Sequence, residues 1–118
     1  MLITVVELPE YIKRAERLLD SFECKAVIDY LAEHPKAGDI MVGTGGIRKL
    51  RWQCGKKGKS GGVRIIYYFH NERFPLFLLT VFGKSERTNL SKTERVALSN
   101  LVKELVNLVV KANYDKSI

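Results

Sequence analysis

The chain has 118 residues, a formal net charge of +7 at pH 7, and a composition that is 46% hydrophobic and 28% charged. This size and balance are typical of one globular domain, spanning residues 1–118, whose core needs no disulfide or metal. The first residues lack the basic start of a secretory signal, and no apolar run reaches the ~18 residues of a membrane span, so we expect a cytoplasmic protein with no membrane partner.

The N-terminal third predicts one strand followed by helix. Residues 2–6 form a short β-branched run, which indicates a strand. Pro9 suits the first turn of a helix, and apolar residues then recur at helical spacing: Tyr11, Ala15, Leu18, Leu19 and Phe22. Asp20 or Ser21 can cap a further helical segment that ends at His34–Pro35, with three inward residues: Val27, Tyr30 and Leu31. The pattern leaves open whether these are two helices or one bent helix.

The sequence after residue 34 predicts an antiparallel β-meander followed by a final helix. A glycine-rich loop over residues 35–46 precedes strand-like runs at 47–53, 63–70 and 75–82, whose short links favour antiparallel pairing. Ser91 and Glu94 have the spacing of a capping box, which opens a helix with one apolar stripe: Ala97, Leu98, Leu101, Leu105, Leu108 and Val109. The predicted fold is α+β in the order β-α-α-β-β-β-α, with two N-terminal helices and one C-terminal helix packed on an antiparallel sheet.

The charge excess is confined to one stretch, residues 40–71, which we call the basic segment. It contains no acidic residue and carries the following basic ones: Arg48, Lys49, Arg51, Lys56, Lys57, Lys59 and Arg64. Elsewhere the basic and acidic residues balance. A merely solvated basic face is the alternative, but this segregation of signs favours a polyanionic partner, most simply nucleic acid.

Nucleotide and metal sites are not predicted. Gly58-Lys59-Ser60 matches the end of a P-loop, but Gln53 stands where the first glycine of that motif belongs, and a strand follows where the motif requires a helix. Cys24 and Cys54 have no metal-ligand spacing, and the basic segment has no carboxylates for Mg²⁺. We therefore expect no cofactor and no metal.

Strand alternation predicts a phosphate site. It places Lys49 and Arg51 on one face of their strand and Arg48 on the other. If Arg64 on the next strand shares the face of Lys49 and Arg51, three cations converge on one phosphate. RNA supplies its own 2′-OH nucleophile, so such a site could cleave RNA without a metal if a group nearby accepts the proton.

The proton acceptor stays open. Lys57 or Lys59 could serve, because a lysine crowded by other cations gives up its proton more readily. Glu86 is the other candidate, unless it only forms a surface salt bridge with Lys84 or Arg87. We expect the two histidines, His34 and His70, to be structural or solvated.

Several stretches together resemble the RelE/HigB toxins of type II toxin–antitoxin systems. They are residues 43–52, 58–68, 78–86 and 90–94, in that order, within a match from about Asp39 to Leu98. The likeness is strongest to the HigB branch, which carries a lysine-rich loop before a G-G-x-R strand. It implies a ribosome-dependent mRNA endonuclease, or mRNA interferase, that inhibits translation by cleaving the codon in the A site. Its implied partners are mRNA, rRNA and a co-encoded antitoxin.

The resemblance also implies residue roles. Arg64 falls at the phosphate-stabilising arginine, and Lys49 and Arg51 at basic residues of the preceding strand. Lys57 and Lys59 match the lysine loop, and Lys84 and Glu86 match the segment after the last strand. We expect the remaining basic residues, Arg48 and Lys56, to bind RNA.

Two positions depart from the family pattern. Ser85 stands where RelE itself has an arginine, and Ser91 stands where RelE has a catalytic tyrosine. Tyr67 or Tyr68 could replace that tyrosine, although tyrosine in an apolar central strand favours a core position. Two alternatives to an enzyme follow from the same basic segment: a non-catalytic RNA- or ribosome-binding module, and a transcription-regulating subunit of a toxin–antitoxin complex.

Overall fold

A mixed five-stranded sheet forms the centre of the protein. The computed structural model describes residues 2–54, 62–87 and 89–116. The strands are β1 (Val5–Glu7), β2 (Asp39–Ile40), β3 (Ile47–Trp52), β4 (Val63–Tyr68) and β5 (Leu76–Gly83). Their order across the sheet is β1-β5-β4-β3-β2; β1 runs parallel to β5, and the other neighbours are antiparallel.

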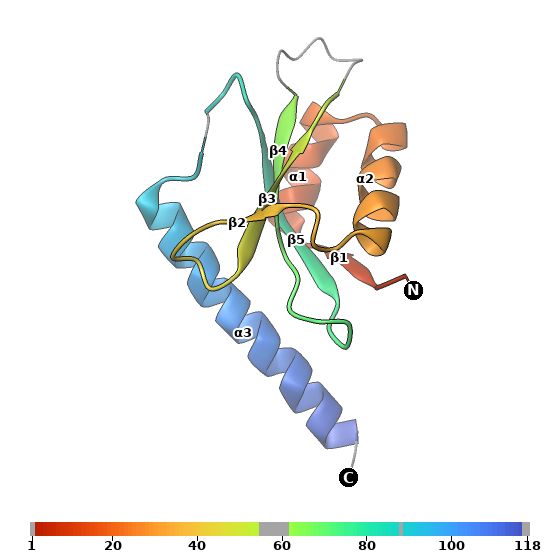
Figure 1. The fold of residues 1–118 in the computed structure, drawn as a ribbon, viewed down its shortest axis with the longest axis vertical. Helices are drawn as coiled ribbons and strands as arrows, with labels where there is room; N and C mark the ends of the chain where they lie inside the picture. Colours follow the sequence, from red (N-terminus) through yellow and green to blue (C-terminus); the bar gives the residue numbers. More distant parts are fainter. Residues whose placement is uncertain (1, 55–61, 88, 117–118) are drawn as a thin grey trace.

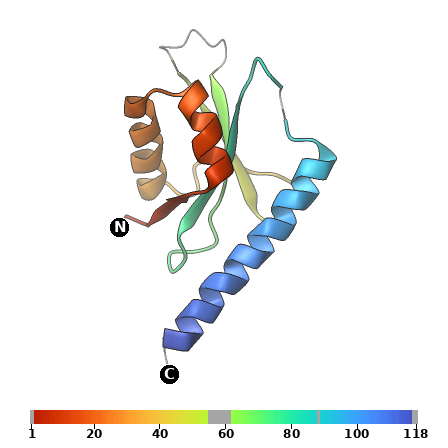
Figure 2. The ribbon, with the colours of Figure 1, turned by 180° about the vertical axis from the view of Figure 1, so that it is seen from behind.

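Helices cover both faces of this sheet. They are α1 (Pro9–Leu18), α2 (Ser21–Glu33) and α3 (Lys92–Lys116). Figures 1 and 2 show α1 and α2 on one face and the long α3 crossing the other. This arrangement confirms the predicted α+β class with two N-terminal helices and one C-terminal helix. The strand predicted over residues 2–6 is β1, but the sheet is mixed and not antiparallel throughout as predicted, because β1 pairs parallel to β5. The two-residue β2 lies within the expected loop and was not predicted.

Each face has its own apolar core. Tyr11, Leu18 and Leu31 of the N-terminal helices pack against Ile65 and Tyr67 of β4. On the opposite face, α3 covers a second cluster that contains Ile66, Tyr68, Phe82 and Val102. Strand β4 contributes to both clusters and is buried throughout, as its apolar residues on both faces predict for a central strand.

The two N-terminal helices are separate. Pro9 occupies the first turn of α1, and the backbone at Leu19 is extended, which ends that helix. The Asp20 side chain accepts a hydrogen bond from the Glu23 N–H at 2.8 Å and caps α2. Phe22, which continues the spacing of the apolar residues of α1, is 77% exposed because the helical phase restarts after the break.

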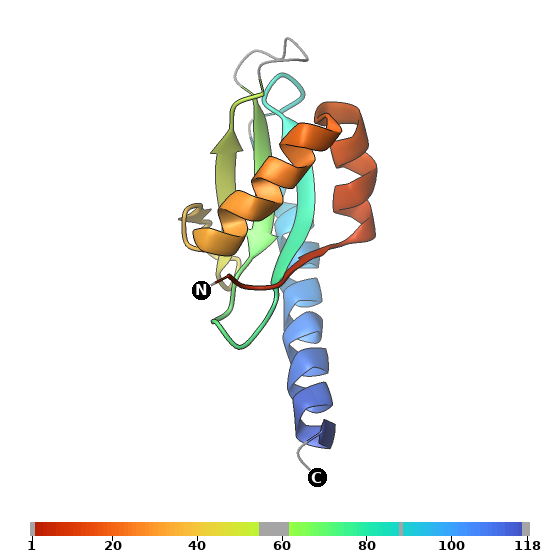
Figure 3. The ribbon, with the colours of Figure 1, turned by 90° about the vertical axis from the view of Figure 1, so that its right-hand side faces the viewer.

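Helix α3 begins with the predicted capping box. The Glu94 N–H donates to Ser91 Oγ at 3.1 Å, and the Ser91 N–H donates to Glu94 Oε1 at 2.9 Å. Three residues of the predicted apolar stripe pack against the sheet: Leu98, Leu105 and Val109. Val102, which was not predicted, is the buried residue, and Leu108 is 64% exposed. The helix has 25 residues, a length of about 37 Å, and its C-terminal part extends past the sheet (Figure 3). None of the described helices is long and apolar enough to cross a membrane.

The first glycine cluster forms the turn into β3. Thr44 Oγ1 donates to the Met41 carbonyl at 2.6 Å and accepts from the Ile47 N–H at 3.1 Å. Gly43, Gly45 and Gly46 have positive φ angles of 77°, 77° and 107°. This G-T-G-G stretch therefore serves a tight turn, which only glycine adopts without strain.

Candidate functional site

Three basic side chains lie on the α3 face of the sheet. Arg51 of β3 is paired with Arg64 of β4, and Lys49 is paired with Ile66. Ile66 belongs to the core beneath α3, so strand alternation puts Lys49, Arg51 and Arg64 on that face. We call these three residues the cationic face. Arg51 is exposed and Lys49 half-buried, while Arg64 is only 8% exposed.

Arg64 is set into the end of the sheet. Its Nη1 donates to the Val63 carbonyl at 3.3 Å, and its register partner on β5 is Phe82. The Arg87 guanidinium lies over the Phe82 ring, with Cζ 4.7 Å from the ring centroid. Arg87 Nη1 also donates to Glu94 Oε1 at 2.5 Å. A second arginine, which the sequence analysis placed only in a possible surface pair, is thus fixed close to Arg64.

The hydrogen bond from Arg87 holds the pKa of Glu94 well below its ordinary value, at about 2, with the Ser91 N–H as a smaller contribution. Glu94 is therefore ionised at neutral pH and keeps Arg87 paired. The carboxylate links the first turn of α3 to the neighbourhood of Arg64.

A cavity of about 350 Å³ lies between β2, β3 and α3 next to the cationic face. We call it the site cavity; it is lined by Asp39, Ile40, Met41, Val42, Lys49, Arg51, Asn89 and Arg95. Neither Arg95 nor Asn89 was predicted from the sequence to belong to a site. Arg95 lies in the part of the chain where basic and acidic residues balance, so no charge pattern marked it.

Lys84 and Glu86 follow β5 directly. The Lys84 N–H donates to the Gly62 carbonyl at 3.1 Å, and Glu86 Oε1 accepts from the Gly83 N–H at 3.2 Å. Gly83 is paired with Val63, the residue before Arg64. The segment that carries Lys84 and Glu86 therefore lies at the Arg64 end of the sheet, and both side chains are exposed there.

Arg48 is not brought together with the cationic face. It alternates to the other side of β3, where its Nη1 donates to the carbonyls of Lys36 at 3.2 Å and Gly38 at 2.7 Å. These contacts hold the loop after α2. The three loop lysines, Lys56, Lys57 and Lys59, lie outside the described residues.

The tyrosines and Ser91 have structural partners. Tyr67 is fully buried on the α1–α2 face; its hydroxyl donates to the Pro35 carbonyl and accepts from the Gly38 N–H, both at 2.8 Å. Burial raises the pKa of Tyr67. Tyr68 shares the α3 face with Arg64 but lies four residues along β4, about 13 Å away. Ser91 Oγ accepts the capping hydrogen bond. The structure therefore brings neither tyrosine to the Arg64 end of the sheet.

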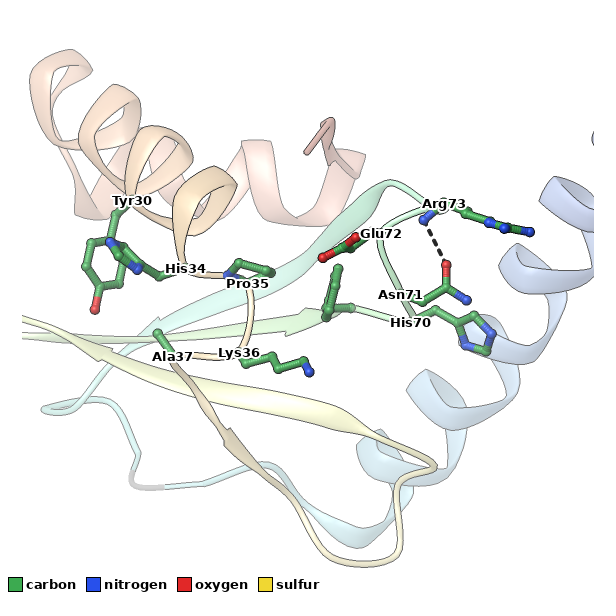
Figure 4. A pocket seen from close by; sticks show the side chains of 10 residues that line it. Tyr30, His34, Pro35, Lys36, Ala37, His70, Asn71, Glu72 and Arg73 are labelled. Atoms are coloured by element: carbon green, nitrogen blue, oxygen red, sulfur yellow. Dashed lines mark hydrogen bonds between the residues drawn. The ribbon is translucent and has the colours of Figure 1, made fainter. Parts of the chain in front are cut away.

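A larger hollow of about 1000 Å³ lies at the other end of β4 (Figure 4). His34 and His70 both line it, which the sequence gave no reason to expect. Figure 4 shows His34 beside Tyr30 at one end and His70 beside Asn71 at the other. The His34 ring lies 4.9 Å from that of Tyr30, and His70 Nδ1 is 2.8 Å from the Tyr68 hydroxyl. Both histidines thus have contacts of their own, and His70 follows the end of β4 opposite to Arg64.

Metal-ligating residues are scattered over the fold. Within residues 2–54, 62–87 and 89–116, no three His, Cys, Asp or Glu side chains gather where they could hold one metal ion.

The chain was compared with known proteins. Residues 9–114 match the family model described as the RelE toxin of the RelE/RelB toxin–antitoxin system. Among solved structures, a mutant of the E. coli toxin RelE in its free state is similar to this chain with a TM-score of 0.56 and 21% sequence identity. That match covers 89% of this chain and 99% of the RelE chain, and at this identity it supports the fold alone. Because the family model spans most of the sequence, the chain belongs to the RelE toxin family.

Proposed function

We propose that this protein is the toxin of a toxin–antitoxin pair and that it inhibits translation in the cytoplasm by cleaving mRNA on the ribosome. A co-encoded antitoxin would neutralise it. Membership of the RelE toxin family supports the toxin role. The predicted assignment to the HigB branch stays a prediction.

The observation that carries the proposal is the register pair of Arg51 and Arg64, with Lys49 on the same face. Two cations on adjacent strands, next to a third, can contact the oxygens of one phosphodiester from two sides. Arg64 is buried and fixed, so its charge needs little reorganisation when negative charge develops on the phosphorus oxygens. We assign Arg64 to stabilise that charge and Lys49 and Arg51 to position the backbone.

The reaction follows from the substrate's own nucleophile. The 2′ oxygen attacks the adjacent phosphorus, the new O2′–P bond forms and the P–O5′ bond breaks, leaving a 2′,3′-cyclic phosphate and a 5′-hydroxyl end. A base must accept the 2′-OH proton, and an acid must protonate the 5′ oxygen. Glu86 and Lys84, at the Arg64 end of the sheet, are our candidates within the described chain, and Lys57 and Lys59 are the candidates outside it.

The test maps mRNA 5′ ends after the protein is added to a purified bacterial translation system. We expect new ends inside A-site codons only when ribosomes are present. Arg64→Ala should lower the cleavage rate about 10²–10³-fold, the usual effect of removing one donor to a developing oxyanion. Because Arg64 is buried, thermal unfolding of the variant must confirm that it folds, and Arg64→Lys provides a second, less disruptive substitution.

A matched control comes from the other face of the sheet. Lys13 of α1 is exposed, so Lys13→Ala removes one positive charge and should leave cleavage unchanged. If folded Arg64→Ala cleaves as fast as Lys13→Ala, the assignment of Arg64 is wrong.

One observation favours a second candidate function. Ser91 occupies the place of the family's catalytic tyrosine and is engaged in capping α3, which fits a basic module that binds ribosomes without cutting RNA. Tight, salt-sensitive ribosome binding with intact mRNA ends would select this alternative.

A further inference from the structure

Arg95 has a feature that the proposed reaction does not use. It lies in the first turns of α3, where its N–H donates to the Ser91 carbonyl at 3.0 Å, and its half-buried side chain lines the site cavity. Its Nε is buried and has no hydrogen-bond partner among the residues that the structure describes. A buried donor of a charged group is normally paired. The Nε itself is covered by protein, as is that of Arg48, so an acceptor from outside the chain would reach the Arg95 guanidinium through the part of the side chain that lines the site cavity.

The walls of the site cavity suit a nucleotide. The lining of the site cavity contains three basic side chains and one carboxylate: Lys49, Arg51 and Arg95, and Asp39. This excess of positive charge favours an anion. Its rim is apolar and open to solvent: Val42 is 89% exposed and Ile40 is 56% exposed. The volume of about 350 Å³ lies at the lower end of small-ligand pockets. Basic side chains next to exposed aliphatic ones suit a nucleotide, whose phosphate is anionic and whose sugar and base offer apolar surface.

We propose that the site cavity binds the nucleotide next to the cleaved bond, with Arg95 contacting its phosphate and Val42 contacting its sugar or base. This inference rests on the proposed function. The ligand is RNA rather than an acidic protein segment because Arg51 both lines the cavity and is paired with Arg64. One strand can therefore extend from the reacting phosphate into the cavity.

A residue that binds a flanking phosphate has a distinct kinetic signature. It contributes to the affinity of ground state and transition state alike, so its loss raises KM and leaves kcat nearly unchanged. Each phosphate contact to a single strand also contributes about 0.7 to the slope of log affinity against log salt. Loss of Arg64 should instead act on kcat.

The experiment uses ribosomes programmed with mRNA that carries a 2′-deoxy nucleotide at the reacting position, so that binding is measured without cleavage. Arg95→Met keeps an apolar side chain of similar length and removes the guanidinium. We expect the dissociation constant and KM to rise about 10- to 100-fold, as for a lost charge-assisted hydrogen bond, and the salt slope to fall by about 0.7. Arg95→Lys should restore the slope but only part of the affinity, because lysine cannot form the bidentate contact.

The matched control is Lys111→Met, which removes the same charge from an exposed position on the same helix. The proposal is overturned if Arg95→Met and Lys111→Met behave alike, or if Arg95→Met lowers kcat alone. Val42→Ser changes an exposed residue that contributes nothing to the core, so it tests the rim without a risk of misfolding; we expect KM to rise about threefold from lost apolar contact.

The outcomes separate this inference from the proposed function. If cleavage depends on Arg64 while Arg95→Met behaves like its control, the proposal of a flanking subsite is wrong and the proposed mRNA cleavage is supported. If the protein never cuts RNA but its binding to programmed ribosomes still depends on Arg95 with the expected salt slope, the proposed cleavage activity is wrong and the nucleotide-binding subsite is supported. If Arg95→Met weakens only the complex with the antitoxin, the cavity is a peptide site and the proposal is overturned.

Discussion

Gly62 stands immediately before β4, and its substitution by alanine should be severe. Its φ angle is +69°, and a Cβ atom there would lie 2.1 Å from the Trp52 carbonyl oxygen and 3.0 Å from Gln53 Cα. Both atoms belong to backbone, so no side-chain rotation can relieve the contact. The end of β3 must move away from the start of β4, where Trp52 is paired with Val63.

The magnitude follows from three costs. A non-glycine residue in the left-handed region costs about 1–2 kcal/mol. Backbone displacement by an overpacked atom typically costs a further 1–3 kcal/mol or so. The hydrogen bond from the Lys84 N–H to the Gly62 carbonyl is worth about 1 kcal/mol. We therefore expect Gly62→Ala to lower the free energy of unfolding by about 3–6 kcal/mol.

Gly43 provides the matched control. Its φ angle is +77°, but a Cβ atom there would meet nothing within 4 Å. Gly43→Ala should therefore cost only the conformational term of about 1–2 kcal/mol. Urea unfolding of both variants measures the difference. Equal destabilisation of the two variants would refute the steric argument, because they differ in the contact and share the positive φ.

Three further predictions concern side chains whose hydrogen-bond partners are described above. Tyr67→Phe removes two hydrogen bonds, including the one from the Gly38 N–H; urea unfolding should show a loss of about 1–3 kcal/mol, with KM unchanged since Tyr67 lies on the face away from the cationic face. Arg48→Ala should destabilise the fold by a similar amount and leave the salt slope of ribosome binding unaltered; a smaller slope would instead make Arg48 an RNA contact. The hydrogen bond from Arg87 lowers the pKa of Glu94 from its ordinary value to about 2, so the contribution of this pair to stability is present above about pH 4.5 and is lost as the pH falls toward 2. The melting temperature of Glu94→Gln should accordingly vary less over that pH range than that of the parent; a pH profile parallel to the parent's would contradict the role of the Arg87 pair.

The parts of the fold that the sequence predicted correctly are governed by local periodicity. The capping box at Ser91 and Glu94 places the start of α3 correctly because both hydrogen bonds are made within one turn. Strand β4 was expected to be central because it carries apolar residues on both of its faces. Strand β2 was missed because it has only two residues, Asp39 and Ile40, and no repeat can be read from two positions.

The phase of α3 shows why packing is harder to predict. Its sequence carries apolar residues on more than one side, so several stripes are compatible with a 3.6-residue repeat. The packed face contains Leu98, Leu105 and Val109 of the predicted stripe together with Val102 and Val106, and it leaves Leu108 exposed. The edges of the buried face are therefore set by how the helix docks on the sheet.

The contacts of Arg48, in the basic segment, were likewise not predictable from the sequence. A count of charge treats Arg48 and Lys49 alike, yet alternation sends them to opposite faces of β3. Alternation was predictable, and so was the separation of Arg48 from the cationic face. What Arg48 contacts was not, because the carbonyls of Lys36 and Gly38 reach it only when the loop after α2 folds back along β3.

The candidate site therefore has two physical origins. Lys49, Arg51 and Arg64 are brought together by the register of one hairpin, a local arrangement that the sequence can indicate. Arg87, in the segment before α3, and Arg95, in the first turn of α3, reach the same region. They do so through the Phe82 ring, the Glu94 carboxylate and the site cavity. Because those contacts depend on how α3 docks, neither arginine could be assigned to the site from spacing or charge. Substitutions that loosen the docking of α3 should therefore displace Arg87 and Arg95 first. The cationic face should stay in place, because the pairing of β3 with β4 holds it.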